Sequence, residues 1–471
     1  MKQDAWQHQI DGRDYGRGRQ HCLLNCGMGT GKSRIALDML LDEIAARAGN
    51  PLPFRALLGC PKAVLPAWGK QHDLWMPHVR MLILTDGTST VKERRIAAAL
   101  ADTSPLIVAA NYETLWRIKL LEATRWDAFI WDEIHRLKAA SGAASKWAAR
   151  MGKHNPTAKR IGLSGTLLAH SPLDAFGSWR AIESPTCQTF GASYTAFKSM
   201  FFIPHPNGIR GAVRTDKIRN EDVFARKIAE TTFLRKSEDV LRLPPIMHEE
   251  IAFPLTTAEA LAYRELSNEF IAQVGGGTVT PANAMVAALR LLQTCNGFAK
   301  LDGVDAPVQI DATPSKATAL REMLEDLHPN EPLVIFCRFR TDIETCLKVL
   351  WDMHRSASEL SGRINSLADW QAGKTTVLVA QIQSGGIGID LTRASYGVFY
   401  SLGHSLSEYL QAIARLHRPG QEKTTRFYSL VATLLGKKTV DGFVYEALSQ
   451  RKEVIDAIID AHNPRRIINC A

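Results

Sequence analysis

The sequence lacks any long apolar run. No stretch of 18 consecutive apolar residues occurs among its 471 residues, so a membrane-spanning helix is not expected. The N-terminal segment MKQDAWQHQ is polar from the start, whereas a secretory signal peptide needs an apolar core. We therefore expect a protein that does not engage a membrane and that works in the cytoplasm, or in the nucleus of a nucleated host.

The sequence also lacks the cysteine patterns that bind metals. Its eight cysteines form no C-x-x-C pair and show no paired Cys/His ligand spacing, which argues against a zinc site or a disulfide framework. Most of them lie in or beside apolar runs, where a reduced cysteine behaves as a small hydrophobic side chain. This pattern favours a reducing compartment.

The composition is that of an ordinary globular protein with a basic balance. Hydrophobic residues make up 45% and charged residues 22% of the chain, so a core of normal size is available. The length exceeds what one compact core usually holds and predicts about two or three domains. The net charge of +9 favours a polyanionic partner without identifying it.

Short apolar strands alternate with helical stretches in the first third of the chain. The expected strands are 21–25, 56–59, 81–84, 105–111, 127–131 and 160–164, and the first expected helix is 33–48. Continuous apolar strands between helices indicate a parallel sheet that is covered on both faces. Ligands of such sheets bind at the carboxyl ends of the strands.

This alternation stops in the middle of the chain and then returns. The middle contains a Pro/Gly-containing stretch at 204–212 and two helical stretches, 257–274 and 281–295, separated by Gly-Gly-Gly. Later strands are expected at 333–339, 375–381, 396–401 and 426–432, followed by a helix at 439–459. We therefore predict an α/β fold in three regions. These are a parallel-sheet domain at 1–183, helical insertions and a linker at 184–310, and a second parallel-sheet domain at 311–471.

A glycine-rich loop follows the first expected strand. It reads Gly27-Met28-Gly29-Thr30-Gly31-Lys32-Ser33 and leads into a helix. Glycines let backbone N–H groups approach phosphate oxygens, and a helix N-terminus adds partial positive charge. Lys32 would reach the β- and γ-phosphates and Ser33 would ligate Mg²⁺. The strict phosphate-loop pattern has glycine where this chain has Cys26, so an ordinary glycine-rich turn is the competing interpretation.

Two adjacent acids, Asp132 and Glu133, follow the strand at 127–131. A metal–phosphate site needs one carboxylate to hold Mg²⁺ and a base to orient water. We assign the first role to Asp132 and the second to Glu133. The competing interpretation is a helix N-terminus whose acids complement the helix dipole.

An arginine-containing segment, Gln411-Ala412-Ile413-Ala414-Arg415-Leu416-His417-Arg418-Pro419-Gly420-Gln421, lies near the C-terminus. If it is helical up to Pro419, Arg415 and Arg418 share one face. Two guanidinium groups aimed at a γ-phosphate would stabilise charge in a transition state. A solvated basic face is the competing interpretation.

Together these motifs resemble superfamily-2 helicases and, more closely, the Swi/Snf-related ATPases, over about residues 5 to 455. The segments that carry the resemblance are Trp6–Gln9, the loop at 27–33, Cys60-Pro61-Lys62 through Trp68, DEIHRLK at 132–138, LSGT at 163–166, FLRKSEDVLRLPP at 233–245, SGGIGIDL at 384–391, the segment at 411–421 and the helix that begins at Thr439. No chromatin-reading, nuclease or zinc module flanks them, which suggests a minimal bacterial, phage or mobile-element member.

The resemblance implies two RecA-like domains in tandem that use ATP and Mg²⁺. By motif position, the implied catalytic residues are Lys32, Asp132, Glu133, Gln411, Arg415 and Arg418. The implied nucleotide-binding residues are Gln9, Gly27, Met28, Gly29, Thr30, Gly31, Lys32, Ser33, Gly388 and Asp390, with Ser33 and Asp132 at the metal. Coupling residues would be His135, Ser164 and Thr166, and nucleic-acid contacts would be Lys62, Arg338 and Arg340. The chain departs from the family at Asp390, where Asn is usual, and at Gly27, where an acid is usual.

The function implied is an ATP-driven translocase on nucleic acid, most consistently double-stranded DNA. Three alternatives remain open. The first is a strand-separating DNA or RNA helicase, and the second is a nucleotide-gated DNA clamp that recruits a partner protein. The third is an ATPase that does not act on nucleic acid. Because phosphate contacts carry no sequence information, low sequence specificity is expected. Contacts with charged phosphates also predict a strong salt dependence.

Overall fold

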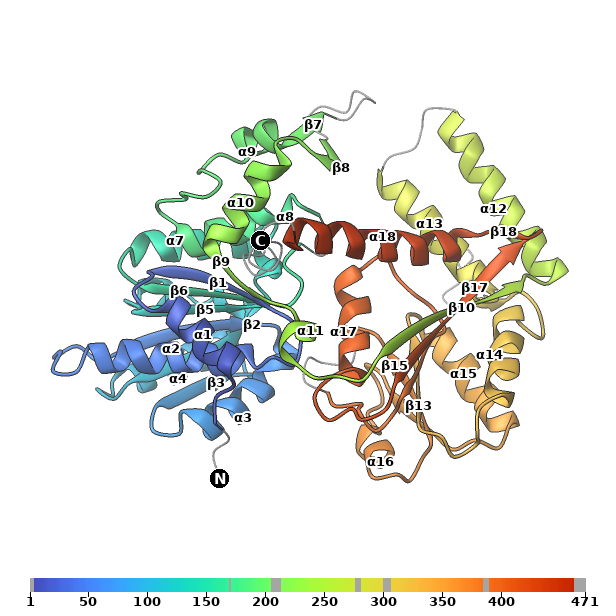
Figure 1. Cartoon of the computed structure of the whole chain (residues 1–471), viewed down its shortest axis with the longest axis horizontal. Coiled ribbons are helices and arrows are strands. Elements are labelled where there is room, and N and C mark those ends of the chain that lie inside the picture. The colour runs from blue at the N-terminus through green and yellow to red at the C-terminus, as the bar shows by residue number, and fades with distance from the viewer. Residues whose placement is uncertain are drawn as a thin grey trace, which may run out of the picture. The chain divides into compact units, whose positions relative to one another are not determined.

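The chain folds into two compact units (Figure 1). The computed structural model describes residues 4–168, 171–204, 213–275, 281–299, 306–383 and 389–460. Among the described residues, unit 1 comprises 4–242 together with 453–460, and unit 2 comprises Leu243–Lys452. The boundary at Arg242 divides the region that the sequence assigned to insertions and a linker, 184–310, between the two units.

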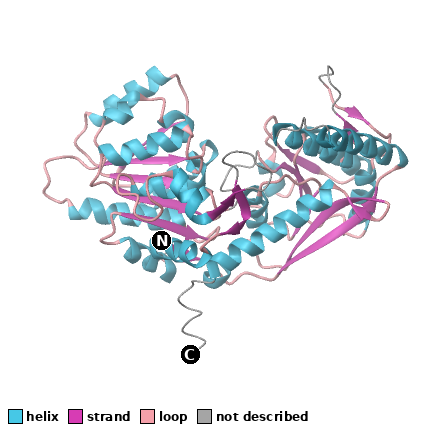
Figure 2. Ribbon diagram, turned by 90° about the horizontal axis from the view of Figure 1, so that it is seen from above, coloured by secondary structure: helices cyan, strands magenta, loops and turns pink. Residues whose placement is uncertain are grey.

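Unit 1 is built on a seven-stranded parallel sheet in the order β3-β4-β2-β5-β6-β1-β9. Its strands are β1 (His21–Cys26), β2 (Arg55–Cys60), β3 (Arg80–Leu84), β4 (Leu106–Asn111), β5 (Ala128–Asp132), β6 (Lys159–Ser164) and β9 (Thr232–Arg235). The central strands are buried along nearly their whole length because helices cover both faces, as Figure 2 shows for the cyan helices around the magenta strands. All six strands predicted in the first third are confirmed.

The helices of unit 1 connect the parallel strands and form an addition after the sixth strand. They are α1 (Gln7–Gly16), α2 (Lys32–Ala46), η1 (Lys62–Val64), α3 (Leu65–Trp75), α4 (Ser89–Leu100), α5 (Tyr112–Leu115), α6 (Lys119–Ala123), η2 (Ile134–Leu137), α7 (Ala143–His154), α8 (Asp174–Glu183), α9 (Tyr194–Phe201), α10 (Glu221–Thr231) and α11 (Ser237–Val240). The short pair β7 (Phe202–Pro204) and β8 (Val213–Ile218) joins α9 to α10. An aromatic cluster that includes Phe190, Phe197, Phe201 and Phe224 holds this addition together.

Unit 2 is built on a second sheet in the order β10-β17-β16-β13-β15-β14, and β18 pairs with β17. Its strands are β10 (Ile246–Pro254), β13 (Leu333–Cys337), β14 (Ala357–Leu360), β15 (Val377–Gln381), β16 (Tyr396–Phe399), β17 (Thr425–Leu434) and β18 (Lys437–Lys438). All neighbours are parallel except β17 and β18. The four strands predicted in this half are confirmed, and with them the α/β fold of two parallel sheets in tandem.

Helices flank this sheet, with α14 and α15 on one side and α17 on the other (Figure 1). The helices of unit 2 are α12 (Thr257–Gly275), α13 (Pro281–Cys295), α14 (Ser315–Glu325), α15 (Arg340–Asp352), α16 (Leu367–Gln371) and α17 (Leu406–Leu416). The last helix, α18 (Val440–Asp460), begins in unit 2 and continues beyond Lys452, where that unit ends. A short hairpin, β11 (Phe298–Ala299) with β12 (Val308–Gln309), follows α13. No helix in the described ranges is both long enough and apolar enough to cross a bilayer.

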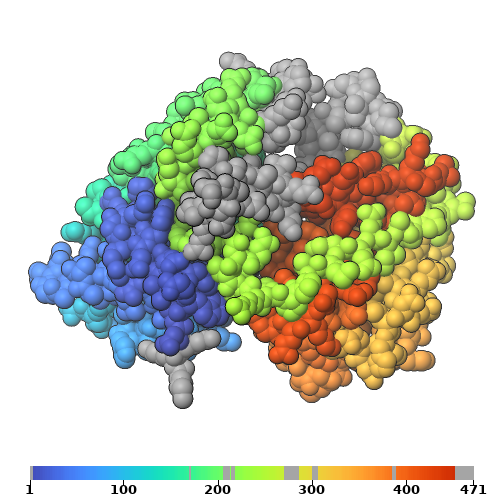
Figure 3. Space-filling model, viewed as in Figure 1, coloured from blue at the N-terminus to red at the C-terminus, as the bar shows by residue number. Residues whose placement is uncertain are grey.

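Two strands of the main sheets, β9 and β10, lie in the region where the sequence predicted helices and a linker. β9 pairs with β1 at one edge of the first sheet, and β10 pairs with β17 over nine residues at one edge of the second. β10 carries His248, Glu249 and Glu250 and is exposed along most of its length, as its yellow-green surface beside the red C-terminal segments shows in Figure 3. An edge strand with one solvated face has no continuous apolar run, so the criterion applied to the sequence could not detect it.

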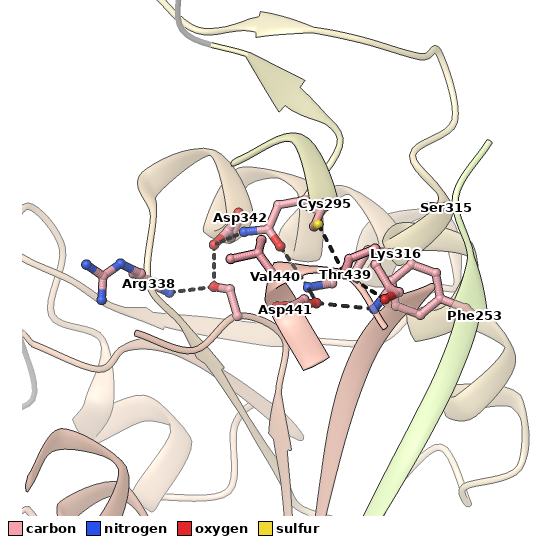
Figure 4. A network of polar contacts seen from close by, with 12 residues as sticks. Phe253, Cys295, Ser315, Lys316, Arg338, Asp342, Thr439, Val440 and Asp441 are labelled. Atoms are coloured by element: carbon pink, nitrogen blue, oxygen red, sulfur yellow. Dashed lines mark hydrogen bonds and ion pairs between the residues drawn. The ribbon is translucent and has the colours of Figure 1, made fainter. Parts of the chain in front are cut away.

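A buried polar network joins four helices of unit 2 (Figure 4). The ammonium of Lys316 on α14 lies 2.5 Å from Asp441 Oδ2 on α18 and 2.8 Å from Asn296 Oδ1 after α13. Asn296 in turn donates to Asp342 Oδ2 on α15 at 3.4 Å. Lys316 has no exposed surface, so the charges must satisfy each other inside the unit.

Candidate nucleotide-binding site

The phosphate loop lies between β1 and α2 and has the backbone that its glycines predict. Gly29 and Gly31 both have φ +79°, a left-handed conformation that favours glycine. A Cβ at Gly31 would lie 2.2 Å from Gln9 Nε2. The first turn of α2 has no side-chain cap, so its backbone N–H groups remain available to an anion.

Lys32 lies over the loop that precedes it. Its Nζ donates to Cys26 O at 2.8 Å and to Gly27 O at 3.1 Å. An ammonium with three N–H donors can exchange such carbonyl contacts for the oxygens of a bound phosphate. Ser33 follows it in the first turn of α2.

Two side chains of α1 close the other side of the loop. His8 Nε2 lies 2.7 Å from Thr30 O, and Gln9 Nε2 donates to the same oxygen at 3.1 Å. Gln9 Oε1 accepts from the backbone N–H of Trp6 at 3.0 Å. The structure thus brings the predicted Gln9 to the phosphate loop and adds His8, which only its place next to Gln9 in the sequence could have suggested.

The segment after β9 braces the loop from a third side. Gly27 N donates to Arg235 O at 2.7 Å, and Ser237 Oγ donates to Met28 O at 2.9 Å. A Cβ at Gly27 would lie 2.1 Å from Ser237 Oγ and 2.5 Å from Ser237 N. This close approach requires glycine at 27. It gives a physical reason why this chain lacks the acid that the family usually has at this position. The sequence did not predict the contact, because about 200 residues separate its partners.

Asp132 ends β5, and its carboxylate is held from two directions. Its Oδ2 accepts from Trp68 Nε1 at 2.8 Å, and its Oδ1 accepts from Glu133 N at 2.9 Å. Tyr112 OH donates to the backbone oxygen of Asp132 at 2.7 Å. Burial, and to a smaller extent the charge of Glu133, raises the pKa of Asp132 to about 6. A cation bound here would favour the ionised form.

Glu133 has an unusual backbone for its residue type. Its φ of 49° and ψ of 54° place it in the left-handed region, which costs a residue other than glycine about 1–3 kcal/mol and is typical of functional sites. Its Oε2 lies 3.2 Å from His135 Nδ1. Burial by itself would raise the pKa of Glu133, but the hydrogen bond and charge of His135 lower it below its usual value. The ionised carboxylate can therefore accept a proton.

Two of the three predicted coupling residues, Ser164 and Thr166, lie beside these groups at the end of β6 and just after it. Ser164 is fully buried, and its Oγ accepts from Thr166 N at 3.0 Å. A Cβ at Gly165 would lie 3.3 Å from Lys32 Nζ. Strand β6 lies between β5 and β1, with Leu163 opposite Asp132. The structure therefore brings the phosphate loop, both acids and the 164–166 turn together at the carboxyl ends of these three strands.

The residues at these strand ends fit a nucleotide with bound Mg²⁺ better than a metal site whose ligands all come from the protein. Among the described residues, no group of three or more His, Cys, Asp and Glu side chains could hold a metal ion. Mg²⁺ typically takes one or two protein oxygens and completes its shell with water and phosphate oxygens. Asp132 and Ser33 would supply the protein oxygens.

The arginines of unit 2 lie at the end of α17, and one part of the prediction for them is wrong. Arg415 is in the last turn, but the helix ends at Leu416, so Arg418 lies beyond it. The two residues therefore do not share a helical face. Arg418 precedes Pro419, and a residue before proline is disfavoured in the α conformation.

Both arginines contact backbone atoms of residues 389–391. Arg418 Nη1 donates to Ile389 O at 3.2 Å, and Arg415 O accepts from Leu391 N at 3.1 Å. Arg418 Nε is buried without a hydrogen-bond partner among the described residues. Burial lowers the pKa of Arg415 to about 10, which still leaves the guanidinium charged at neutral pH.

The remaining candidates of unit 2 near α17 differ in their surroundings. Gln411 donates to Ser407 Oγ at 3.3 Å within the helix. Asp390 is exposed, and its Oδ1 accepts from Thr392 N at 2.9 Å and from Thr392 Oγ1 at 2.7 Å, a local turn for which Asn is equally suited. Gly388 lies outside the described residues.

The predicted nucleic-acid residues lie in both units. Lys62 is exposed at the start of η1, just after β2. Arg338 follows β13, and its backbone N donates to Ser401 Oγ at 2.8 Å (Figure 4). Arg340 is exposed as the first residue of α15. Their role stays a prediction.

Comparison with known proteins identifies the family. The model of the SNF2-related domain matches residues 13–299, and that of the helicase conserved C-terminal domain matches residues 315–420. The chain belongs to the SNF2-related family. It is therefore an ATP-hydrolysing enzyme of the Swi/Snf type, and its two parallel sheets are the tandem RecA-like core of that family.

Individual SNF2-related relatives are distant. Putative protein p41 of Acyrthosiphon pisum secondary endosymbiont phage 1 is 22% identical, over 94% of this chain and 97% of that protein. The DNA repair and recombination protein RAD54B of Gallus gallus is also 22% identical, over 94% of this chain but only 52% of its own length. A solved Sulfolobus solfataricus SWI2/SNF2 ATPase core in complex with dsDNA is 20% identical, with a TM-score of 0.44 and coverage of 98% of this chain and 94% of that one.

Proposed function

We propose that this SNF2-related ATPase hydrolyses ATP to move along double-stranded DNA. The observation that best supports ATP hydrolysis is that Lys32, Asp132, Glu133 and Gly165 lie together at the carboxyl ends of β1, β5 and β6. The net charge of +9 and the presence of relatives named for DNA repair and recombination support DNA as the partner.

Each residue of the site has a role in this proposal. Gly29 to Lys32 bind the nucleotide phosphates through backbone N–H groups and the ammonium. Mg²⁺, held through Ser33 and Asp132, would neutralise charge on the phosphates. Glu133, ionised and held in a left-handed backbone conformation, orients and deprotonates the attacking water. Arg415 and Arg418 stabilise the charge that develops on the γ-phosphate.

The remaining assignments concern coupling and contact. Ser164 and Thr166, which adjoin Lys32 through Gly165, and His135, which contacts Glu133, respond to the nucleotide state. Lys62, Arg338 and Arg340 bind the phosphate backbone. Contacts to phosphates carry no sequence information, so binding should show little sequence preference. Because the phosphates are charged, binding should also weaken steeply as the salt concentration rises.

The test is the ATPase rate on matched duplex DNA of increasing length. A motor spends more time on a longer track before it dissociates, so the rate should rise with length and then level off. A clamp that does not travel should be stimulated equally by short and long duplexes. The Lys32→Ala variant, which should lose turnover, shows that the measured ATPase belongs to this site.

A second assay distinguishes translocation from strand separation. A translocase should displace the third strand of a DNA triplex without unwinding the duplex beneath it. Unwinding without triplex displacement would favour the helicase alternative. Parallel ATPase assays with single-stranded DNA and RNA of the same length identify the preferred nucleic acid, and stimulation by RNA alone would contradict the proposal.

A further inference from the structure

Trp68 connects two functional segments of unit 1 that are far apart in the sequence. It lies on α3, at the end of the segment from Cys60 to Trp68 that the family resemblance assigns to the nucleic-acid backbone. Its indole Nε1 donates to Asp132 Oδ2 at 2.8 Å. The Trp68 side chain is 1% exposed and Asp132 is 8% exposed, so water cannot readily replace this hydrogen bond.

The hydrogen bond determines how the carboxylate of Asp132 is oriented. Its other oxygen accepts from the backbone N–H of Glu133, the next residue. Within the described part of the chain, Trp68 is the only side chain seen to donate to this carboxylate. A local backbone contact fixes one oxygen, and only the indole ties the other to a separate element, α3.

The path from Lys62 to this indole is short and runs through continuous helical structure. Strands β2 and β5 are adjacent, and Gly59 is opposite Trp131, so the chain leaves β2 beside Asp132. It then forms η1, which begins at Lys62, and continues directly into α3. Leu65 has no exposed surface, which anchors the start of the helix. Through this connection, a displacement of η1 would be passed to the indole and from the indole to the carboxylate.

We propose that Trp68 is a positioning residue that couples contact with nucleic acid at η1 to the orientation of Asp132 and hence to ATP hydrolysis. This inference rests on the proposed function, because it explains how bound nucleic acid stimulates the ATPase. In this proposal Trp68 acts through Asp132 and does not itself bind the nucleotide or the nucleic acid. Its loss should therefore uncouple the two activities and leave nucleic-acid binding intact.

The test compares Trp68→Phe with Trp75→Phe. Trp75 lies on the same helix, and its Nε1 donates to Gln71 Oε1 at 3.0 Å, so the control also loses one indole hydrogen bond on α3. Loss of a partner that orients a metal ligand typically costs roughly 10- to 100-fold in metal affinity or activity. We expect Trp68→Phe to raise the Mg²⁺ concentration needed for half-maximal binding of fluorescent ADP by about that factor, and Trp75→Phe to leave it unchanged.

The coupling is measured in a second readout. The ratio of ATPase rates with and without duplex DNA should fall towards one in Trp68→Phe, while duplex binding measured by fluorescence anisotropy stays at the wild-type level. Loss of duplex binding together with a lowered melting temperature would show a purely structural role and overturn the inference. A wild-type ratio and a wild-type Mg²⁺ requirement in Trp68→Phe would overturn it as well.

A second variant separates the N–H from the volume of the ring. Replacing Trp68 by the tryptophan analogue that has sulfur in place of the indole N–H keeps the shape and removes only the donor. It should reproduce the effect of Trp68→Phe, and wild-type behaviour would contradict the proposal. If the wild-type enzyme is not stimulated by any nucleic acid, the proposed function fails, whereas the Mg²⁺ readout still tests the link between Trp68 and Asp132.

Discussion

Replacement of Lys316 by methionine should destabilise unit 2 strongly, because it leaves a buried carboxylate without its cation. Lys316 is fully buried, and its ammonium lies 2.5 Å from Asp441 Oδ2 (Figure 4). Asp441 is 5% exposed and would keep the weaker contact of Ala432 N at 3.3 Å. Breaking a buried ion pair by removing one partner typically costs ~3–5 kcal/mol.

This cost corresponds to a large change in melting temperature. For a domain of roughly 150–250 residues, each kcal/mol shifts the melting temperature by about 2–4 °C. Lys316→Met should therefore lower the transition of unit 2 by roughly 6–20 °C in differential scanning calorimetry of the whole chain. The double variant Lys316→Met with Asp441→Leu should recover much of this loss, since an apolar pair of similar volume often replaces a buried ion pair at little cost.

An exposed pair in the same unit is the matched control. Lys374 Nζ lies 2.8 Å from Asp369 Oδ1, but the two side chains are 70% and 50% exposed. Water solvates both charges, so Lys374→Met should leave the melting temperature unchanged. A shift of less than about 2 °C for Lys316→Met, or a double variant that loses the sum of the two single variants, would refute the reasoning from burial.

Three further outcomes are expected. Gly27→Ala should lower nucleotide affinity and cost about 1–3 kcal/mol of stability, because its Cβ would lie 2.5 Å from the backbone N of Ser237; unchanged ADP binding and melting temperature would argue against the contact. Arg418→Ala should slow hydrolysis by roughly 1,000-fold or more and spare nucleotide binding, whereas equal loss of both would exclude a role in the transition state. Burial raises the pKa of Asp342 to about 6, above the ~3.9 of an unfolded aspartate, so the folded state binds this proton more tightly. The stability that this proton contributes should be lost as pH rises from about 4 to about 6, and Asp342→Asn should flatten that part of the plot of melting temperature against pH.

The sequence by itself determined the parts of this protein that depend on neighbouring residues. Strands with continuous apolar runs, the glycine-rich loop after β1 and the two acids at the carboxyl end of β5 were all predicted at their observed places. Their positions follow from local patterns, because a buried parallel strand needs consecutive apolar residues and its carboxyl end carries the ligand-binding groups. Edge strands β9 and β10 were not predicted, because polar residues interrupt both segments and leave no continuous apolar run.

Only the tertiary structure decided which distant residues meet at the site. The contacts of Ser237 with Gly27, of Trp68 with Asp132 and of His8 with Thr30 join segments whose separation in the chain says nothing about their distance in space. A motif fixes the chemistry that a residue can perform, whereas packing between elements fixes the partner that orients it, since that partner depends on how every intervening strand and helix is placed.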